Sequence, residues 1–300
     1  MTPVWMLRHG AFSPVSSEKQ GGTPSRFTLW GVVNVTPDSF SDGGRHADEG
    51  AALSHARKLA REGARILDFG GASSRPGAED VPAEKELARV LGVTRAVCGL
   101  RDAGDADFAC RLVSVDTWRA LVAARTLEAG ADIINDISAC SWEPELMDVA
   151  AQYRPGYVLM HCLPGTTPGT MQKAPRYENV TDEVIAFFEE RMAALVKAGL
   201  PEEHIALDPG IGFGKTAEHN SSLLHDMERL LALGRPVLLG VSRKSLFGDL
   251  LGLDVAHRGE ATNVCTALLA ARGVRHHRVH DVCSARQALT LAERFTPWKD

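Results

Sequence analysis

From Phe27 onward, short apolar runs alternate with longer segments in which apolar residues recur every three or four positions. The short runs are typical of buried strands, and the periodic segments, such as 49–64 and 181–200, are typical of amphipathic helices. The strand-like runs lie at 29–35, 65–70, 111–116, 132–137, 157–161, 204–208, 236–242 and 275–280. The pattern therefore predicts a regular series of strand–helix units.

Several of the helical segments end in a glycine shortly before the next strand, which is the usual sign of a helix C-terminus. These glycines are Gly63, Gly130, Gly199, Gly234 and Gly273. Near-continuous apolar strands indicate a parallel sheet that is buried on both faces. We predict an α/β fold, a (β/α)8 TIM barrel formed by one domain over residues 27–300; an open doubly wound sheet is the alternative. Residues 1–26 are rich in Ser, Gly and Pro, and we expect a flexible N-terminal extension there.

Composition narrows the class of protein. The net charge of −5 and the pI of about 6.1 argue against a nucleic-acid partner. We expect no secretory signal and no membrane span, because the apolar runs are too short. The six cysteines are widely spaced and fit neither a disulfide framework nor a zinc pattern. We expect reduced thiols in a cytoplasmic protein.

Polar residues stand at or near the end of every predicted strand. They are Asn34, Asp68, Asp116, Asn135, His161, Asp208, Lys244, Arg278 and His280. A single Asn or Asp in such a place is commonly a helix cap or a turn residue. The whole set favours a binding site, since active sites of barrels lie at the C-terminal ends of the strands.

Arg278 and His280 are two residues apart, as are Ser242 and Lys244, so each pair is expected on one face of its strand. Such a convergence of cations suits a substrate with an anionic part; the alternative is a salt bridge at the strand end that involves Asp281. Two loops rich in Gly, Pro and hydroxyl residues, 34–44 and 70–78, follow strands and resemble mobile lids. The segment 208–216 is not a Walker A loop, because Pro209 occupies the place of its first glycine. Strand alternation also argues against a metal site formed by His276, His277 and His280.

These motifs resemble those of dihydropteroate synthases. NVTPDSFSDGG, GGASSRPGA, SVDT, NDIS, LMH, DPGIGFGKT, SRKS and RVHDV occur in the order of that family, over roughly nine-tenths of the chain. The resemblance implies a (β/α)8 homodimer with a transferase activity in folate biosynthesis. Its substrates would be 6-hydroxymethyl-7,8-dihydropterin diphosphate and 4-aminobenzoate, with Mg2+ as the cofactor and sulfonamides as inhibitors that mimic 4-aminobenzoate.

The resemblance also implies roles for individual residues. The pterin would be bound by Asp116, Asn135, Asp208, Lys244 and Arg278. The diphosphate would be bound by Asn34, Arg75, Arg278 and His280, with Asn34 as a ligand of Mg2+. The 4-aminobenzoate pocket would be bordered by Phe40, Ser74, Pro76, Phe213 and Ser245. The residues expected to act in catalysis are Asp38, Lys244, Arg278 and His280, with Asp38 steadying the developing cation.

Two departures from the family pattern lie in the second loop, where Ala72 replaces the usual glutamate and Ser74 the usual threonine. Ser74 keeps a hydroxyl, whereas Ala72 removes a charge. Two other interpretations stay open at this point. One is a folate- or pterin-dependent methyltransferase barrel, and the other is a pterin-binding paralogue without turnover.

Overall fold

The computed structural model describes residues 3–12, 19–20, 23–36, 45–73, 81–163, 165–166, 170 and 175–296. Eight parallel strands form one sheet in the order β10-β9-β8-β7-β6-β5-β12-β11. They are β5 (Thr28–Asn34), β6 (Ile66–Gly70), β7 (Leu112–Asp116), β8 (Ile133–Asp136), β9 (Gly156–Met160), β10 (Ile205–Asp208), β11 (Leu238–Leu239) and β12 (His276–Val279). All eight predicted runs are confirmed as strand positions.

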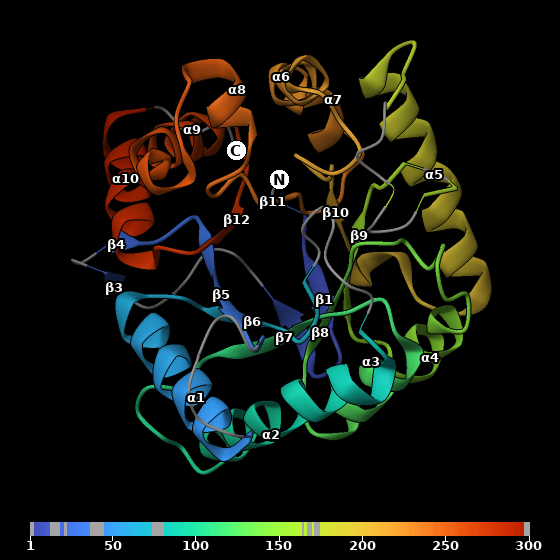
Figure 1. The fold of residues 1–300 in the computed structure, drawn as a ribbon, viewed down its shortest axis with the longest axis vertical. Coiled ribbons are helices and arrows are strands. Elements are labelled where there is room, and N and C mark those ends of the chain that lie inside the picture. Colours follow the sequence, from blue (N-terminus) through green and yellow to red (C-terminus); the bar gives the residue numbers. More distant parts are fainter. Residues whose placement is uncertain are drawn as a thin grey trace.

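The sheet closes on itself between its first and last strands. Leu207 in β10 forms a parallel bridge with Val237, and its amide donates to the carbonyl of Pro236 over 2.8 Å. The strands therefore surround a common axis, and Figure 1 shows them inside a ring of helices. A closed barrel removes the exposed sheet edges that an open sheet would leave. The predicted (β/α)8 barrel is confirmed, and the open-sheet alternative is wrong.

Helices surround the barrel in chain order (Figure 1). They are α1 (Arg45–Glu62), α2 (Ala83–Asp102), α3 (Ala120–Glu128), α4 (Leu146–Tyr153), α5 (Val180–Ala198), α6 (Ala217–His225), α7 (Met227–Leu231), α8 (Leu246–Leu251), α9 (Gly259–Ala271) and α10 (Val282–Phe295), with the short 3-10 turns η2 (Glu202–His204) and η3 (Val255–His257). The five glycines predicted to follow helices all have positive φ, between 72° and 116°. Only glycine adopts this conformation without steric cost, which explains the helix ends.

Strand alternation divides the apolar residues into two cores. The larger core lies between the outer face of the barrel and the helices, and contains residues such as Leu67 and Phe69. The smaller core fills the N-terminal part of the barrel interior with Trp30, Ile66 and Ile133. Among the residues that the structure describes, no helix is long and apolar enough to cross a bilayer.

An N-terminal hairpin covers the end of the barrel at which the strands begin, opposite the end that carries the polar residues. Strands β1 (Trp5–Leu7) and β2 (Gly10–Phe12) pair antiparallel, and further along the chain β3 (Lys19–Gln20) pairs with β4 (Thr23–Pro24). The fully buried Trp5 stacks on Trp30 with 5.8 Å between the ring centroids and donates to the carbonyl of His204 over 2.6 Å. A flexible extension was expected over 1–26, but residues 5–12 form an ordered plug because their apolar side chains complete the inner core. The remaining part of that expectation stays a prediction.

Candidate active site at the C-terminal end of the barrel

The strand register places four residues in one row at the C-terminal rim. Asn34 in β5 pairs with Gly70 in β6, Gly70 with Asp116 in β7, and Asp116 with Asn135 in β8. A Cβ added to Gly70 would lie 3.7 Å from both Asn34 Oδ1 and Asp116 Cβ, so the three residues meet at one point. The sequence-predicted residues Asn34, Asp116 and Asn135 are therefore neighbours in the fold.

Arg278 from β12 reaches across the barrel to two carboxylates. Its Nε donates to Asp68 Oδ2 over 2.6 Å, and its Nη2 donates to Asp116 Oδ2 over 2.8 Å. Asn135 Nδ2 also donates to Asp68 Oδ2, over 3.3 Å. Asp68 is fully buried, and it ties Arg278 and Asn135 together. Asp68 stands at a strand end in the sequence, where no role for it is predicted; in the structure it is the carboxylate beneath Arg278 and Asn135.

Burial and charge set the ionisation of this network. Burial raises the pKa of Asp116 to about 7, although Arg278 opposes the shift. Burial by itself would lower the pKa of Arg278, but Asp68 and Asp116 raise it above its ordinary value. Arg278 is therefore a permanent cation, and for Asp116 burial favours the protonated form while Arg278 favours the charged form.

The C-terminal opening of the barrel is called the mouth below. Asp208 and Lys244 lie at the mouth on the side away from Asp116. Asp208 accepts a hydrogen bond from the amide of Gly210 over 2.7 Å, and burial raises the pKa of Asp208. The ammonium of Lys244 lies 3.9 Å from the centroid of the Phe213 ring, a cation–π contact. Burial lowers the pKa of Lys244 to about 8, with Asp208 opposing the shift. The mouth thus presents carboxylate acceptors, an ammonium donor and an aromatic face.

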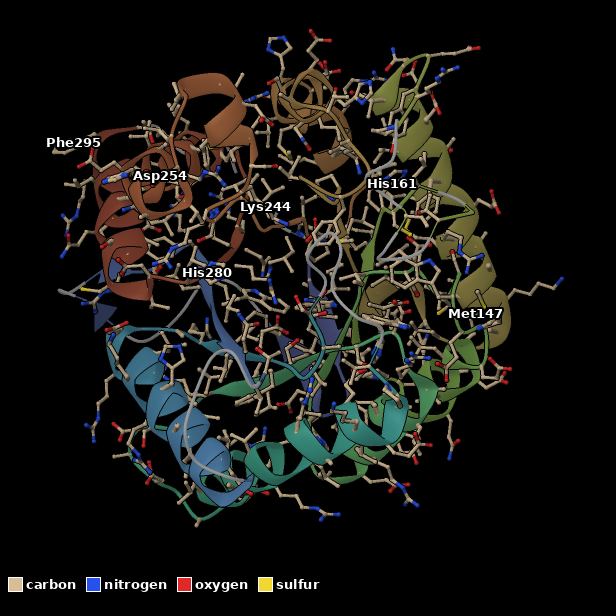
Figure 2. All side chains as sticks on the ribbon, viewed as in Figure 1. Met147, His161, Lys244, Asp254, His280 and Phe295 are labelled. Atoms are coloured by element: carbon tan, nitrogen blue, oxygen red, sulfur yellow. The ribbon has the colours of Figure 1, made fainter. Side chains whose placement is uncertain are left out.

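The prediction that Ser242 and Lys244 share one face of a strand is wrong. Strand β11 ends at Leu239, and Arg243 has a φ of +58°, so Ser242 and Lys244 lie in a turn and not in a strand. Ser242 Oγ contacts His280 Nδ1 at 2.9 Å and accepts from the amide of His280 at 3.3 Å. Figure 2 shows Lys244 and His280 inside the ring of helices. Ser242 therefore orients His280, a role that the sequence analysis did not assign.

The alternative salt bridge with Asp281 is wrong for this site. Asp281 is the N-cap of α10, where its side chain accepts from the amide of Ser284 over 3.0 Å. Arg278 takes its carboxylate partners from β6 and β7 instead. The strand-end residues therefore form a site across the barrel and not a local cap.

An apolar cluster borders the polar residues. It consists of Trp118, Ile137 and Met160 with Ala72, Trp142 and Phe213 around them. The rings of Trp118 and Trp142 meet edge to face with centroids 5.3 Å apart. Ala72, the departure from the family pattern, thus packs against apolar side chains in a partly buried position. Such a surface suits the face of an aromatic ring.

The remaining predicted residues divide into two groups. Ser245 is exposed and directly precedes α8. Asp38, Phe40, Ser74, Arg75 and Pro76 lie outside the described residues. Their roles stay predictions.

A bound metal would depend on few protein ligands. In the described part of the chain, no three His, Cys, Asp or Glu side chains gather in a way that could hold a metal ion. Asn34 Oδ1, at the rim beside Gly70, is a neutral oxygen donor of the kind that Mg2+ accepts. Mg2+ commonly takes one or two protein ligands and completes its shell with substrate phosphates and water.

Comparison with known proteins agrees with this geometry. Residues 30–280 match the family described as pterin binding enzyme. The dihydropteroate synthase of Escherichia coli (strain K12) is 40% identical over 265 residues, which is 88% of this chain and 90% of that protein. The chain belongs to the dihydropteroate synthase family.

Solved structures support the same assignment. Yersinia pestis dihydropteroate synthase with a sulfonamide drug complex has a TM-score of 0.83 at 34% identity and covers 97% of this chain and 98% of its own. Xanthomonas albilineans dihydropteroate synthase with 4-aminobenzoic acid has a TM-score of 0.80 at 41% identity, covering 90% and 94%. The predicted family and its transferase activity in folate biosynthesis are confirmed, and the methyltransferase interpretation has no support.

Proposed function

We propose that this chain condenses 6-hydroxymethyl-7,8-dihydropterin diphosphate with 4-aminobenzoate to give 7,8-dihydropteroate and diphosphate. The observation that carries the proposal is the group Asp116, Asn135, Asp208 and Lys244 around Arg278 at the barrel mouth. Polar groups are buried there at a free-energy cost, which a polar ligand with matching donors and acceptors would offset. The 4-aminobenzoic acid named for the Xanthomonas structure supports the second of these substrates.

The pterin would bind by its aminopyrimidinone edge. Asp116 and Asp208 accept from the ring N–H donors, while Asn135 can both donate and accept. Lys244 supplies a further donor. The face of the ring would lie against the guanidinium of Arg278, whose planar face can stack on it.

The diphosphate would lie toward Arg278 and His280, with Asn34 and Arg75 beside it. Ser242 Oγ contacts Nδ1 of His280 and so fixes the orientation of the imidazole toward the leaving group. Asn34 would hold Mg2+, and the ion, when bound, neutralises charge on the diphosphate. Arg278 adds a fixed positive charge on the protein side.

The reaction requires positioning more than a strong base. The bond between the pterin methylene carbon and the bridging oxygen breaks, and diphosphate leaves with the electron pair. The lone pair of the aromatic amine forms the new C–N bond, and the amine nitrogen releases one proton to solvent. Asp38 would steady the cation that develops at the methylene carbon, and the site holds the two reactants in line.

The second substrate would occupy the mouth next to the pterin. Phe213 and Ser245 would border the 4-aminobenzoate pocket, and Phe40, Ser74 and Pro76 would complete it from the two loops. Phe213 already contacts the Lys244 ammonium, so one aromatic ring would serve both substrate sites.

A second copy of the chain is the proposed macromolecular partner. Exposed large apolar side chains occur on α9 and α10, namely Val264, Leu268, Leu291 and Phe295, with exposed fractions between 55% and 78%. The two helices are neighbours in the ring (Figure 1), and Figure 2 shows Phe295 at the outer edge of the molecule. Such a surface is typical of a homodimer interface. The six free cysteines favour the reducing cytoplasm.

A turnover assay with the two substrates tests the function. We expect dihydropteroate and diphosphate to form in equal amounts. Asp208→Ala should weaken pterin binding by roughly 2–4 kcal/mol, since it leaves ligand donors without an acceptor. The matched control is Asp148→Ala at an exposed position of α4, which should bind the pterin normally.

Three outcomes separate the interpretations. Pterin binding without any product would favour a paralogue that has lost turnover. Methyl transfer from a folate would favour the methyltransferase. Equal effects of Asp208→Ala on stability and on pterin affinity would contradict the proposed role of Asp208.

A further inference from the structure

The loop between β10 and α6 folds around the buried ammonium of Lys215. Lys215 is only 5% exposed. Its Nζ lies 3.0 Å from the carbonyl oxygen of Phe213, 3.2 Å from that of Gly210 and 2.8 Å from His161 Nδ1. Burial lowers the pKa of Lys215 to about 7. In its protonated form the side chain has three N–H donors, and three acceptors surround it. Lys215 therefore fixes two carbonyls of its own loop and one side chain of another strand.

His161 connects this loop to the neighbouring strand β9. It directly follows β9, is 1% exposed, and its backbone amide donates to the carbonyl of Asp208 over 2.9 Å. Burial, and then the positive charge of Lys215, hold the pKa of His161 well below its ordinary value. The imidazole is therefore neutral, and its Nδ1 can accept from the ammonium. We call the contacts of Lys215 with His161 and with the two loop carbonyls the clamp. The clamp connects the C-terminal ends of β9 and β10, which lie at the site.

The glycines of the loop allow this close wrapping. Gly210, Gly212 and Gly214 all have positive φ. A Cβ at Gly210 would lie 2.1 Å from the carbonyl oxygen of His161, a distance that no side chain could tolerate. Outside the clamp, the amide of Gly212 donates to Asn220 Oδ1 over 2.8 Å. The loop is thus held to α6, to β9 and to its own lysine.

The clamp acts on Phe213, which faces the substrates. Lys215 holds the Phe213 carbonyl, while the ring of the same residue lies under the ammonium of Lys244. A rotation of the loop would move this ring and with it the support of Lys244. The three N–H donors of the Lys215 ammonium have three partners within the protein. Lys215 therefore stabilises the loop and does not bind the ligand.

We propose that Lys215 is a positioning residue that sets the Phe213 ring, and through it Lys244, for the aromatic substrates. The inference rests on the proposed function for the identity of those substrates. It adds Lys215 and His161 to the residues on which the reaction depends, although neither contacts the substrates. Figure 2 shows His161 and Lys244 inside the ring of helices, on the side of the mouth where this loop lies.

Lys215→Met tests the proposal, because methionine keeps the length of the side chain and removes the donors. We expect KM for 4-aminobenzoate to rise about tenfold, as for the loss of one or two hydrogen bonds, with a smaller change in kcat. Lys215→Gln, which keeps an N–H2 group, should recover part of this loss. Lys197→Met at an exposed position of α5 is the control and should resemble the unchanged protein.

A double-mutant cycle with Phe213→Ala shows whether Lys215 acts through this ring. The double variant should bind 4-aminobenzoate about as weakly as Phe213→Ala alone, since the ring that Lys215 positions is absent. If the double variant raised KM by the product of the two single effects, or if Lys215→Met left KM unchanged, the proposal would be overturned. If Lys215→Met does not fold, the same cycle with Lys215→Gln decides.

Hydrogen exchange gives a readout that does not depend on activity. The amide of Phe213, which donates to the Gly210 carbonyl over 3.0 Å, should exchange faster in Lys215→Met and not in Lys197→Met. Unchanged exchange at Phe213 would overturn the proposal. Absent turnover in the unchanged protein would instead contradict the proposed function, so the two failures are distinct.

Discussion

At the residue scale, the site is a set of buried charges that hold one another in place. Arg278 offsets the cost of burying Asp68 and Asp116, since each carboxylate receives a charge-assisted hydrogen bond. The pKa of Asp116 is raised to about 7 and that of Lys244 is lowered to about 8, in both cases first by burial. A ligand that supplies hydrogen bonds to these groups would change their protonation on binding.

Behind the rim lies a further buried acid, Glu86 on α2. It is fully buried, and a Cβ on Gly71 at the start of the second loop would touch its side chain at 3.1 Å. Burial raises the pKa of Glu86 from 4.5 to about 7, although Thr117 and Arg119 lower it. The folded protein therefore keeps a proton on Glu86 at pH values where the unfolded chain has lost it. This contribution to stability is present below pH 4.5 and is lost as the pH rises to about 7.

Glu86→Gln removes this pH dependence, because glutamine stays neutral. Between pH 5 and pH 8 the unchanged protein should lose on the order of 2–3 kcal/mol more unfolding free energy than Glu86→Gln does. Urea unfolding at the two pH values measures it. Glu84→Gln, exposed on the same helix, serves as the control. Parallel pH profiles for the Glu86→Gln variant and the unchanged protein would contradict the assignment.

At the element scale, the β1–β2 hairpin completes the inner core at the N-terminal end of the barrel. Its residues Trp5, Leu7 and Phe12 join side chains from the barrel strands in one cluster. A Cβ on Gly156 would lie 2.4 Å from Leu7 Cδ2, so β9 begins with glycine where the hairpin approaches it. The hairpin lies at the N-terminal end of the strands, away from the polar mouth, where barrels commonly concentrate residues that serve stability.

Trp5→Ala should therefore destabilise the protein without changing the site. We expect a loss of about 3–5 kcal/mol in unfolding free energy, the cost of a large cavity at a fully buried aromatic side chain. KM for both substrates should stay the same at a temperature where the variant is folded. Val4→Ala, at a position that is 56% exposed, is the neighbouring control. Equal stability of the two variants would show that the hairpin is not part of the core.

At the scale of the whole molecule, the N-terminal end of the barrel is apolar and supports stability, whereas the C-terminal end is polar and carries the site. Trp30 and Ile66 pack against the hairpin at the N-terminal end of the strands. The next inward-facing residue of β6 after Ile66 is the charged Asp68. The change from apolar to polar layers occurs inside the closed barrel and follows from the two-residue period of a strand. The exposed apolar side chains of α9 and α10 lie on the outside, so association of two chains would not cover the mouth.

Leu268→Asp tests this arrangement. A charge on the exposed apolar surface should shift the protein from dimer to monomer, since an unpaired carboxylate would be desolvated in the interface. Sedimentation velocity measures the change in mass. Val196→Asp, on α5 and 43% exposed, is the control that should stay dimeric. A monomeric parent protein, or a Leu268→Asp variant that stays dimeric, would contradict the proposed interface.

Much of this architecture follows from local pattern. The alternation of apolar runs and helical segments, with a glycine after each of five helices, predicts the order of the elements. Eight units favour a closed barrel, with an open doubly wound sheet as the alternative, and the bridge between Leu207 and Val237 decides for closure. The site residues Asp116, Asn135, Asp208 and Arg278 stand out for the same reason, since polar residues at successive strand ends must meet at one rim.

The sequence by itself determined the eight strands, the rim on which the polar residues lie and, through its motifs, the family. Only the tertiary structure decided that Asp68 is the partner of Arg278, that Ser242 orients His280, and that Lys215 is clamped by His161. It also decided that Trp5 completes the inner core. Each of these contacts joins residues that are distant along the chain, up to 210 positions apart for Arg278 and Asp68. Periodicity reports which face of an element is buried, whereas the partner on that face depends on strand register and on closure of the barrel.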